Sequence, residues 1–105
     1  MIEWRVTDEM RENFGIEWFR DIAALFVDET ATVIETLDPA DPKALAQKLH
    51  FIRGSAESMG LVRLASLCRA AEHSLRNRRP VSVESIVEVY HASCAQMTDR
   101  LRTLR

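Results

Sequence analysis

The chain has 105 residues, 47% of them hydrophobic and 29% charged, so it has the length of one domain, residues 1–105, and the composition of a soluble globular protein. With only three glycines and three prolines it lacks residues for the many turns of a β protein, and this favours an all-α fold. The formal net charge is −2, with no basic run interleaved with aromatic residues and no stretch of about eighteen apolar residues, so we expect neither nucleic-acid binding nor a membrane span.

A short first helix is predicted to begin at Thr7, which can cap it because two acidic residues follow in the first turn. Gly15 offers a stop for this helix. So short a helix is not stable alone. We therefore expect it to lie against the other helices through Met10 and Phe14.

The second predicted helix runs from about Ile16 to Leu37. The segment from Asp38 to Pro42 ends it, because two prolines each remove a backbone donor and push the preceding residue out of the helical region. Asp41 can then cap the third helix, and Pro42 fits the first helical position. The apolar face of the second helix is expected to contain Phe19, Ile22, Leu25, Phe26, Val33 and Leu37.

The third predicted helix has one apolar side and one polar side. At a period of 3.6 residues, Arg53 lies beside both His50 and Gly54, which are one turn apart on the exposed side. The apolar side consists of Leu45, Leu49, Ile52, Ala56 and Met59, and the exposed side of Lys43, Gln47, His50, Gly54 and Glu57.

Gly54 is unusual because a glycine within a helix costs about 1 kcal/mol relative to alanine, with no turn or cap there to explain it. Its position one turn from His50 indicates a site where another protein approaches the bare backbone. Gly60 is expected to end the helix as a left-handed cap.

Two further helices follow. The fourth runs to about Asn77, with Glu72 at the border of its apolar stripe, and the last is capped by Ser82 after a loop. Four long amphipathic helices joined by short loops predict an antiparallel up-down-up-down four-helix bundle, with the short N-terminal helix added to it. The inward residues are expected to be Leu64, Leu67, Cys68, Ala71 and Leu75 in the fourth helix, and Ile86, Tyr90, Cys94, Met97, Leu101 and Leu104 in the last.

Cys68 and Cys94 have no C-x-x-C or other metal-ligand spacing, so we expect reduced thiols in the core. The start, MIEWRVTDEM, carries charges where a signal peptide needs an apolar segment, so we expect a cytoplasmic protein. Trp4 and Trp18 are expected to cover the core, and His73 and His91 to be ordinary solvated residues.

The stretch from His50 to Gly60, HFIRGSAESMG, resembles the signature of histidine-containing phosphotransfer (HPt) domains, H-x-L-K-G-S-A-x-x-L-G. His50 matches the phosphorylated histidine, Gly54 and Gly60 match the two glycines, and Arg53 stands where the family usually has lysine. The resemblance covers most of the chain and implies a helical bundle.

The resemblance also implies a role for each residue near His50. The ring accepts a phosphoryl group from a receiver-domain aspartate or sensor kinase and passes it to a response-regulator aspartate. Arg53 stabilises the charge on that group, and Gly54 gives the partner access. Glu72, twenty-two positions after the histidine, accepts a hydrogen bond from Nδ1–H and so orients the ring.

The implied partners are response-regulator receiver domains and a hybrid or other sensor histidine kinase. The divalent metal is expected on the receiver, so this chain needs no cofactor, and it has no ATP-binding motif of its own. The residues assigned to partner docking are Gln47, Phe51, Gly54, Glu57 and Ser58. For Phe51 the sequence leaves open whether the ring docks a partner or packs on the first helix.

Two alternatives compete with the relay. The chain could be a non-phosphorylated HPt-like module that regulates a partner by surface docking, or a dimerising histidine phosphotransferase. The second usually builds its bundle from two chains, whereas this chain has enough helices for one, so we expect a monomer. A metal or acid/base site of His50 with Glu57 and Glu72 lacks a second histidine at ligand spacing.

Overall fold

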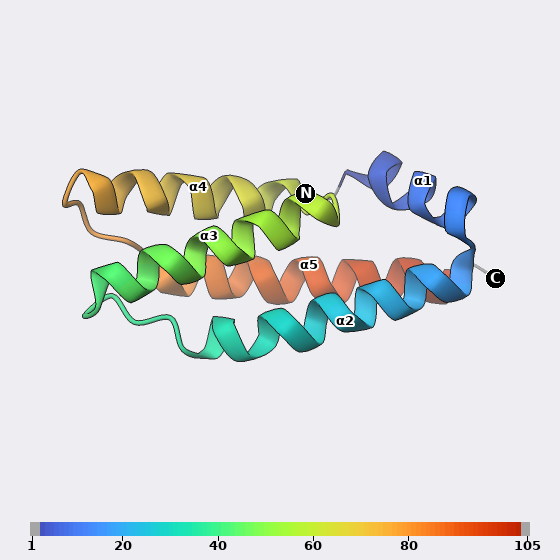
Figure 1. Ribbon diagram of the computed structural model, residues 1–105, viewed down its shortest axis with the longest axis horizontal. Helices are drawn as coiled ribbons and strands as arrows, with labels where there is room; N and C mark the ends of the chain where they lie inside the picture. The colour runs from blue at the N-terminus through green and yellow to red at the C-terminus, as the bar shows by residue number, and fades with distance from the viewer. Residues whose placement is uncertain (1–2, 104–105) are drawn as a thin grey trace.

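The computed structural model describes residues 3–103, except for the side chains of Thr7, Met10 and Arg11. The described residues form five α-helices and no strand (Figure 1). Within this range no helix combines the length and the apolar character needed to cross a membrane. The helix bounds are Trp4–Phe14 for α1, Ile16–Glu35 for α2, Pro42–Ser58 for α3, Val62–Arg76 for α4 and Val83–Thr103 for α5.

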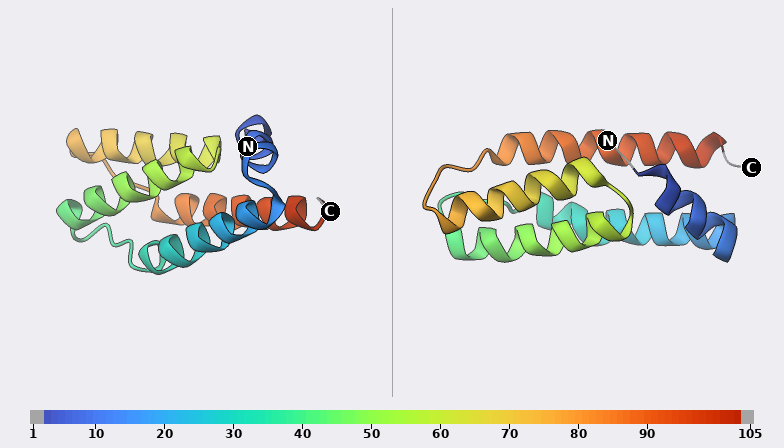
Figure 2. Two further views of the ribbon diagram at one scale, coloured as in Figure 1. Left: turned by 45° about the vertical axis from the view of Figure 1, so that its right-hand side comes forward. Right: turned by 90° about the horizontal axis from the view of Figure 1, so that it is seen from above.

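The four long helices run alternately in opposite directions, which confirms the predicted antiparallel up-down-up-down bundle (Figure 1). The molecule is elongated, with extents of 46 × 22 × 19 Å. Figure 2 shows that α3 and α4 form a hairpin over one part of the longer helices α2 and α5, while α1 lies beyond the turn of that hairpin. The short helix therefore covers the end of the bundle that the hairpin does not reach.

Capping side chains fix the starts of two helices as predicted. The Asp41 carboxylate accepts a hydrogen bond from the Ala44 backbone N at 3.2 Å, and α3 begins at Pro42. The Ser82 hydroxyl accepts one from the Ser85 backbone N at 3.3 Å, at the start of α5. These caps satisfy backbone donors that a helix start leaves without a partner.

The prediction that Thr7 caps α1 is wrong. The helix already begins at Trp4, and the Glu3 carboxylate accepts a hydrogen bond from the Arg5 backbone N at 3.3 Å. Glu3 is itself held in place, since its backbone N donates to the Gly60 carbonyl at 2.6 Å. The side chain of Met10, a predicted contact of this helix, lies outside the described residues, and Phe14 stacks on Trp18 of α2 with ring centroids 4.4 Å apart.

The core lies where the helical stripes predict it, with differences in α2. Leu25 is 50% exposed, whereas Ile34 is buried. Trp18, expected over the core, is 39% exposed, and Leu104 lies outside the described residues. Thr30 is fully buried although it is polar, because its hydroxyl bonds to the Phe26 carbonyl at 2.6 Å and lies 2.9 Å from the Tyr90 hydroxyl.

Candidate functional site

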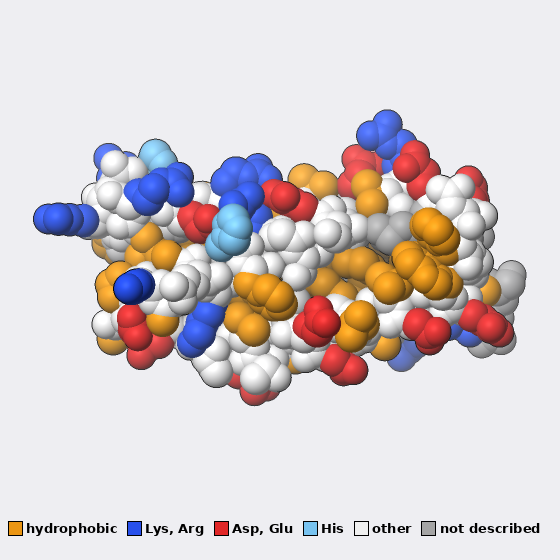
Figure 3. All heavy atoms as spheres, in the orientation of Figure 1, with side chains coloured by type: hydrophobic (Ala, Val, Ile, Leu, Met, Phe, Trp, Pro, Cys, Tyr) orange, Lys and Arg blue, Asp and Glu red, His pale blue; other side chains and the backbone are white. Residues whose placement is uncertain are grey.

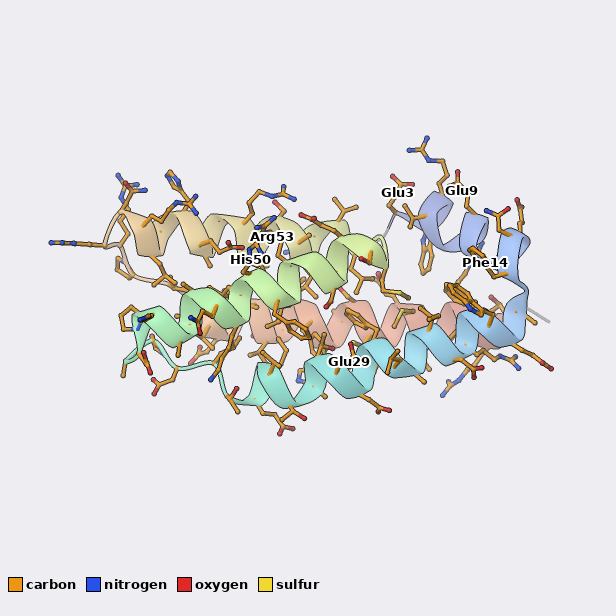
Figure 4. All side chains as sticks on the ribbon, in the orientation of Figure 1. Glu3, Glu9, Phe14, Glu29, His50 and Arg53 are labelled. Atoms are coloured by element: carbon orange, nitrogen blue, oxygen red, sulfur yellow. The ribbon has the colours of Figure 1, made fainter. Side chains whose placement is uncertain are left out.

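Helix α3 has the two sides that the sequence predicts. Its five predicted apolar residues are buried, from 0 to 3% exposed, and all five predicted polar-side residues are exposed. Burial of the apolar side fixes the rotation of the helix, and with it the direction of the opposite side. Figure 4 shows His50 and Arg53 next to each other on α3, on the side nearest α4.

The His50 side chain is 72% exposed to solvent. Its Nδ1 atom lies 2.8 Å from Nη2 of Arg53, which is a hydrogen-bond distance. Nδ1 lies 3.6 Å from Oε2 of Glu72, which is too far for a hydrogen bond. An imidazole with this exposure can be reached by a reactive group on another protein.

Glu72 reaches the site from α4, and only 11% of its side chain is exposed. Its Oε1 atom accepts a hydrogen bond from Nε of Arg53 at 2.6 Å. The predicted hydrogen bond from Nδ1 of His50 to Glu72 is thus replaced by one from the guanidinium. The Arg53 side chain is long enough to contact both the ring and the carboxylate.

This hydrogen bond with Glu72 raises the pKa of Arg53, so the guanidinium is charged near neutral pH. A guanidinium has five N–H donors in one plane and no acceptor. Arg53 binds Glu72 through Nε and His50 through Nη2, and its Nη1 makes a longer contact with Glu57. Each Nη atom carries two N–H groups, so the guanidinium can also donate to an anion placed beside the ring.

Glu57 and Arg69 extend the charged cluster. Arg69, on α4, donates to Oε1 of Glu57 at 2.8 Å, and Nη1 of Arg53 lies 3.5 Å from the same oxygen. The hydrogen bond from Arg69 lowers the pKa of the Glu57 carboxyl, with further help from the charge of Arg53. Sequence reasoning missed Arg69; the signal that could have found it is its position one turn before Glu72 on the same helix.

Cys68 lies in the core behind this cluster and is fully buried. Burial raises the pKa of its thiol to about 12, so the thiol stays protonated and unreactive near neutral pH. Both Cys68 and Cys94 are free thiols, as predicted.

Gly54 has no packing role within the protein. A Cβ atom built on it would meet no heavy atom within 4 Å, so the space beside this turn is open. The Ser58 hydroxyl donates a hydrogen bond to the Gly54 carbonyl at 3.1 Å. The bare backbone next to His50 is therefore accessible from outside.

Hydrophobic side chains gather on the surface where α2 and α3 meet, next to the charged cluster over α3 and α4 (Figure 3). Phe51 is 42% exposed, and α1 packs on α2 and lies beyond the end of α3, so the ring does not pack on the first helix (Figure 1). The predicted docking residues Gln47 and Ser58 are exposed as well. A shallow groove on the same surface is lined by Ile22, Leu25, Phe26, Glu29, Ser55, Ser58 and Met59.

Across residues 3–103, no three His, Cys, Asp or Glu side chains come together as a metal site would require. The site consists of the exposed His50 imidazole, two guanidinium groups, two carboxylates and the open backbone at Gly54. Such an arrangement can present a nucleophile to a partner protein, because the His50 side chain is 72% exposed to solvent rather than enclosed in a pocket.

Comparison with known proteins gives one match. A family model described as the Hpt domain matches residues 21–105, which include every residue of the charged cluster and all of α3, α4 and α5. No curated protein and no solved structure matches the chain.

Proposed function

The chain belongs to the Hpt domain family, and we propose on this basis that it is a histidine phosphotransfer protein of a two-component phosphorelay, with His50 as the phosphoacceptor. The observation that carries this proposal is the His50 ring, 72% exposed between the Arg53 guanidinium and the open backbone of Gly54. Phosphoryl transfer asks mainly for positioning and charge neutralisation, so a surface without an enclosed pocket can support it.

In the proposed reaction, Nε2 of His50 attacks the phosphorus of an aspartyl phosphate on a receiver domain. An N–P bond forms, the acyl P–O bond breaks, and the aspartate leaves as a carboxylate. Arg53 can turn an N–H toward the phosphoryl oxygens while Glu72 holds the other side of its guanidinium. The receiver is expected to supply the divalent metal, so this chain contributes the nucleophile and one cation.

The receiver is proposed to dock over the strip formed by Gln47, Phe51, Gly54, Glu57 and Ser58. Exposure of Phe51 beside the groove of α2 and α3 supports this, because an exposed aromatic ring next to an apolar groove is a common anchor of interfaces. Gly54 lies between Phe51 and Glu57 and leaves room for the partner's backbone. A partner seated there would cover the His50 ring.

Phosphoryl donors and acceptors of the chain are proposed to be response-regulator receivers and a hybrid or other sensor kinase. We further propose that it acts as a monomer in the cytoplasm. The monomer is supported by the core of this chain, which already buries the apolar faces of all four long helices against one another.

The test is incubation with a receiver domain phosphorylated on its aspartate, followed by measurement of label on this chain. We expect label that is stable in alkali and lost in acid, as for phosphohistidine, and no label on His50→Ala. His73→Ala is the matched control, because His73 is an exposed histidine on α4 outside the charged cluster, and it should be labelled normally. Receiver binding without label would favour the non-phosphorylated binding module instead.

A further inference from the structure

The contact between Arg53 and His50 determines which ring nitrogen carries the proton. A guanidinium can only donate, so at 2.8 Å from Nη2 the Nδ1 atom of His50 must be the acceptor. A neutral imidazole has one N–H, so its proton then lies on Nε2, the nitrogen on the outer side of the ring. That atom has no free lone pair in this arrangement.

We propose that Arg53 holds His50 in a tautomer that cannot accept a phosphoryl group, and that release of this contact is a required step before transfer. The proposal rests on the proposed function of His50 as phosphoacceptor. It makes Arg53 a positioning residue in the resting protein, in addition to its role at the phosphoryl group.

Release changes the protonation of the ring without changing its charge. When the guanidinium leaves Nδ1, water takes the Nε2 proton and returns one to Nδ1. Oε2 of Glu72, 3.6 Å from Nδ1, is the acceptor nearest to the new N–H and needs only a small movement to bind it. The Nε2 lone pair is then free to form the N–P bond as the acyl P–O bond breaks and the aspartate carboxylate leaves.

Two other anions favour release when a phosphorylated receiver arrives. Oε1 of Glu57 already lies 3.5 Å from Nη1 of Arg53, so the guanidinium has a second carboxylate within reach. The phosphoryl group brings at least one further negative charge to the same place, and arginine binds such oxygens through its planar fork. The negative charge of the phosphoryl group that the partner brings therefore helps to break the hydrogen bond between Arg53 and His50.

Only an arginine side chain has the geometry to keep His50 in the tautomer that cannot accept a phosphoryl group. Nε of Arg53 binds Glu72 while Nη2 binds His50, so one rigid plane spans the two groups. A lysine has a single nitrogen on a flexible chain and cannot hold both with this fixed geometry. The family's usual lysine at this position would leave Nδ1 free to donate to Glu72.

The experiment is a long-range ¹H–¹⁵N correlation spectrum of the full chain labelled with ¹⁵N. It is recorded at a pH of about 8.5, well above the ordinary histidine pKa of about 6.5. His50 is assigned by the loss of its signals in His50→Gln. In the wild type we expect a protonated Nε2 and an unprotonated Nδ1, and in Arg53→Lys and Arg53→Ala we expect the proton on Nδ1.

Arg69→Lys is the matched control, because Arg69 binds Glu57 in the same cluster without touching the ring, and it should keep the wild-type pattern. The Arg53→Lys chain should also be phosphorylated at least about threefold faster by the same receiver, because a larger fraction of its rings is competent. A wild-type ring with the proton on Nδ1, or one whose pattern does not change in Arg53→Ala, would overturn the proposal. A wild type with the expected tautomer that takes no label would count against the proposed function and leave the tautomer assignment standing.

Discussion

At the scale of single residues, the arrangement of His50, Arg53 and Glu72 shows what helical periodicity can and cannot predict. Periodicity placed His50 outward and Glu72 at the border of the core, and both positions are confirmed. It could not predict that Arg53 lies between them. The direction of a long side chain depends on the neighbouring helix, which offers the Glu72 carboxylate 2.6 Å from Nε of Arg53.

Glu72→Ala is expected to slow the phosphorylation of His50 by about tenfold without abolishing it, since outer residues that orient a reacting imidazole typically contribute factors of this order. The substitution removes the carboxylate that binds Arg53 and that is proposed to accept a hydrogen bond from Nδ1–H of His50. The measurement is the rate of labelling by a phosphorylated receiver. Glu72→Gln, which keeps an acceptor oxygen, should lose less, and an unchanged rate in the alanine variant would remove Glu72 from the site.

At the scale of elements, the two glycines of the sequence motif, one inside helix α3 and one after its end, have different structural roles. Gly54 lies within α3 with open space beside it, whereas Gly60 ends the helix region with φ +72°. A Cβ on Gly60 would come within 2.7 Å of the Glu3 carbonyl oxygen. The sequence predicted that Gly60 ends the third helix in a left-handed conformation. Only the structure shows that Gly60 also leaves room for the backbone just before α1.

The two glycines therefore respond in opposite ways to alanine. Gly54→Ala should raise the free energy of unfolding by about 0.5–1 kcal/mol, because it improves a helix interior and meets no atom. Gly60→Ala should lower it by about 1 kcal/mol or more, through its positive φ and the clash with Glu3. Urea unfolding of both variants is the measurement, and two changes of the same sign would contradict the assignment.

The Gly54→Leu variant tests whether Gly54 is needed for the partner to reach His50, independently of the stability of the fold. Gly54 is exposed and a Cβ atom there meets no heavy atom within 4 Å, so we expect the variant to unfold at about the wild-type urea concentration, while its phosphorylation by a receiver should be strongly reduced. Ala92→Leu, which places the same leucine side chain at an exposed position of α5, is the control and should be phosphorylated normally. Normal transfer in Gly54→Leu would refute the role of Gly54 in partner access.

At the scale of the whole molecule, the sequence predicted the order of the helices, their alternating directions and the buried stripes. It did not predict where α1 would sit. That position depends on contacts between residues far apart in the chain, such as the ion pair of Asp8 with Arg100 and the hydrogen bond of Glu3 with Gly60. The spacing of apolar residues within one helix carries no information about such pairs. Leu25 and Trp18 were expected in or over the core, but they are 50% and 39% exposed because the other helices cover α2 only partly.

Arg100 is expected to fasten α1 to the end of α5. Its Nη2 lies 3.2 Å from Oδ1 of Asp8, and its guanidinium lies 5.3 Å from the centroid of the Trp4 ring. Arg100→Ala should therefore lower the free energy of unfolding by about 0.5–1 kcal/mol and speed amide hydrogen exchange in α1. Arg102→Ala is the control, because Arg102 pairs with Asp99 at 3.7 Å on the exposed surface of the same helix, so this substitution should change neither quantity. Equal effects of the two variants would contradict this role.

The charged cluster comes from one short piece of chain. His50, Arg53, Glu57, Arg69 and Glu72 all belong to two consecutive helices joined by the turn at residues 59–61. Contacts between segments so near in sequence form quickly during folding, because little chain entropy is lost in closing the loop. The charged cluster proposed to take part in transfer thus lies within fewer than thirty consecutive residues, so a single stretch of two helices is expected to carry the site wherever the rest of the bundle supports its fold.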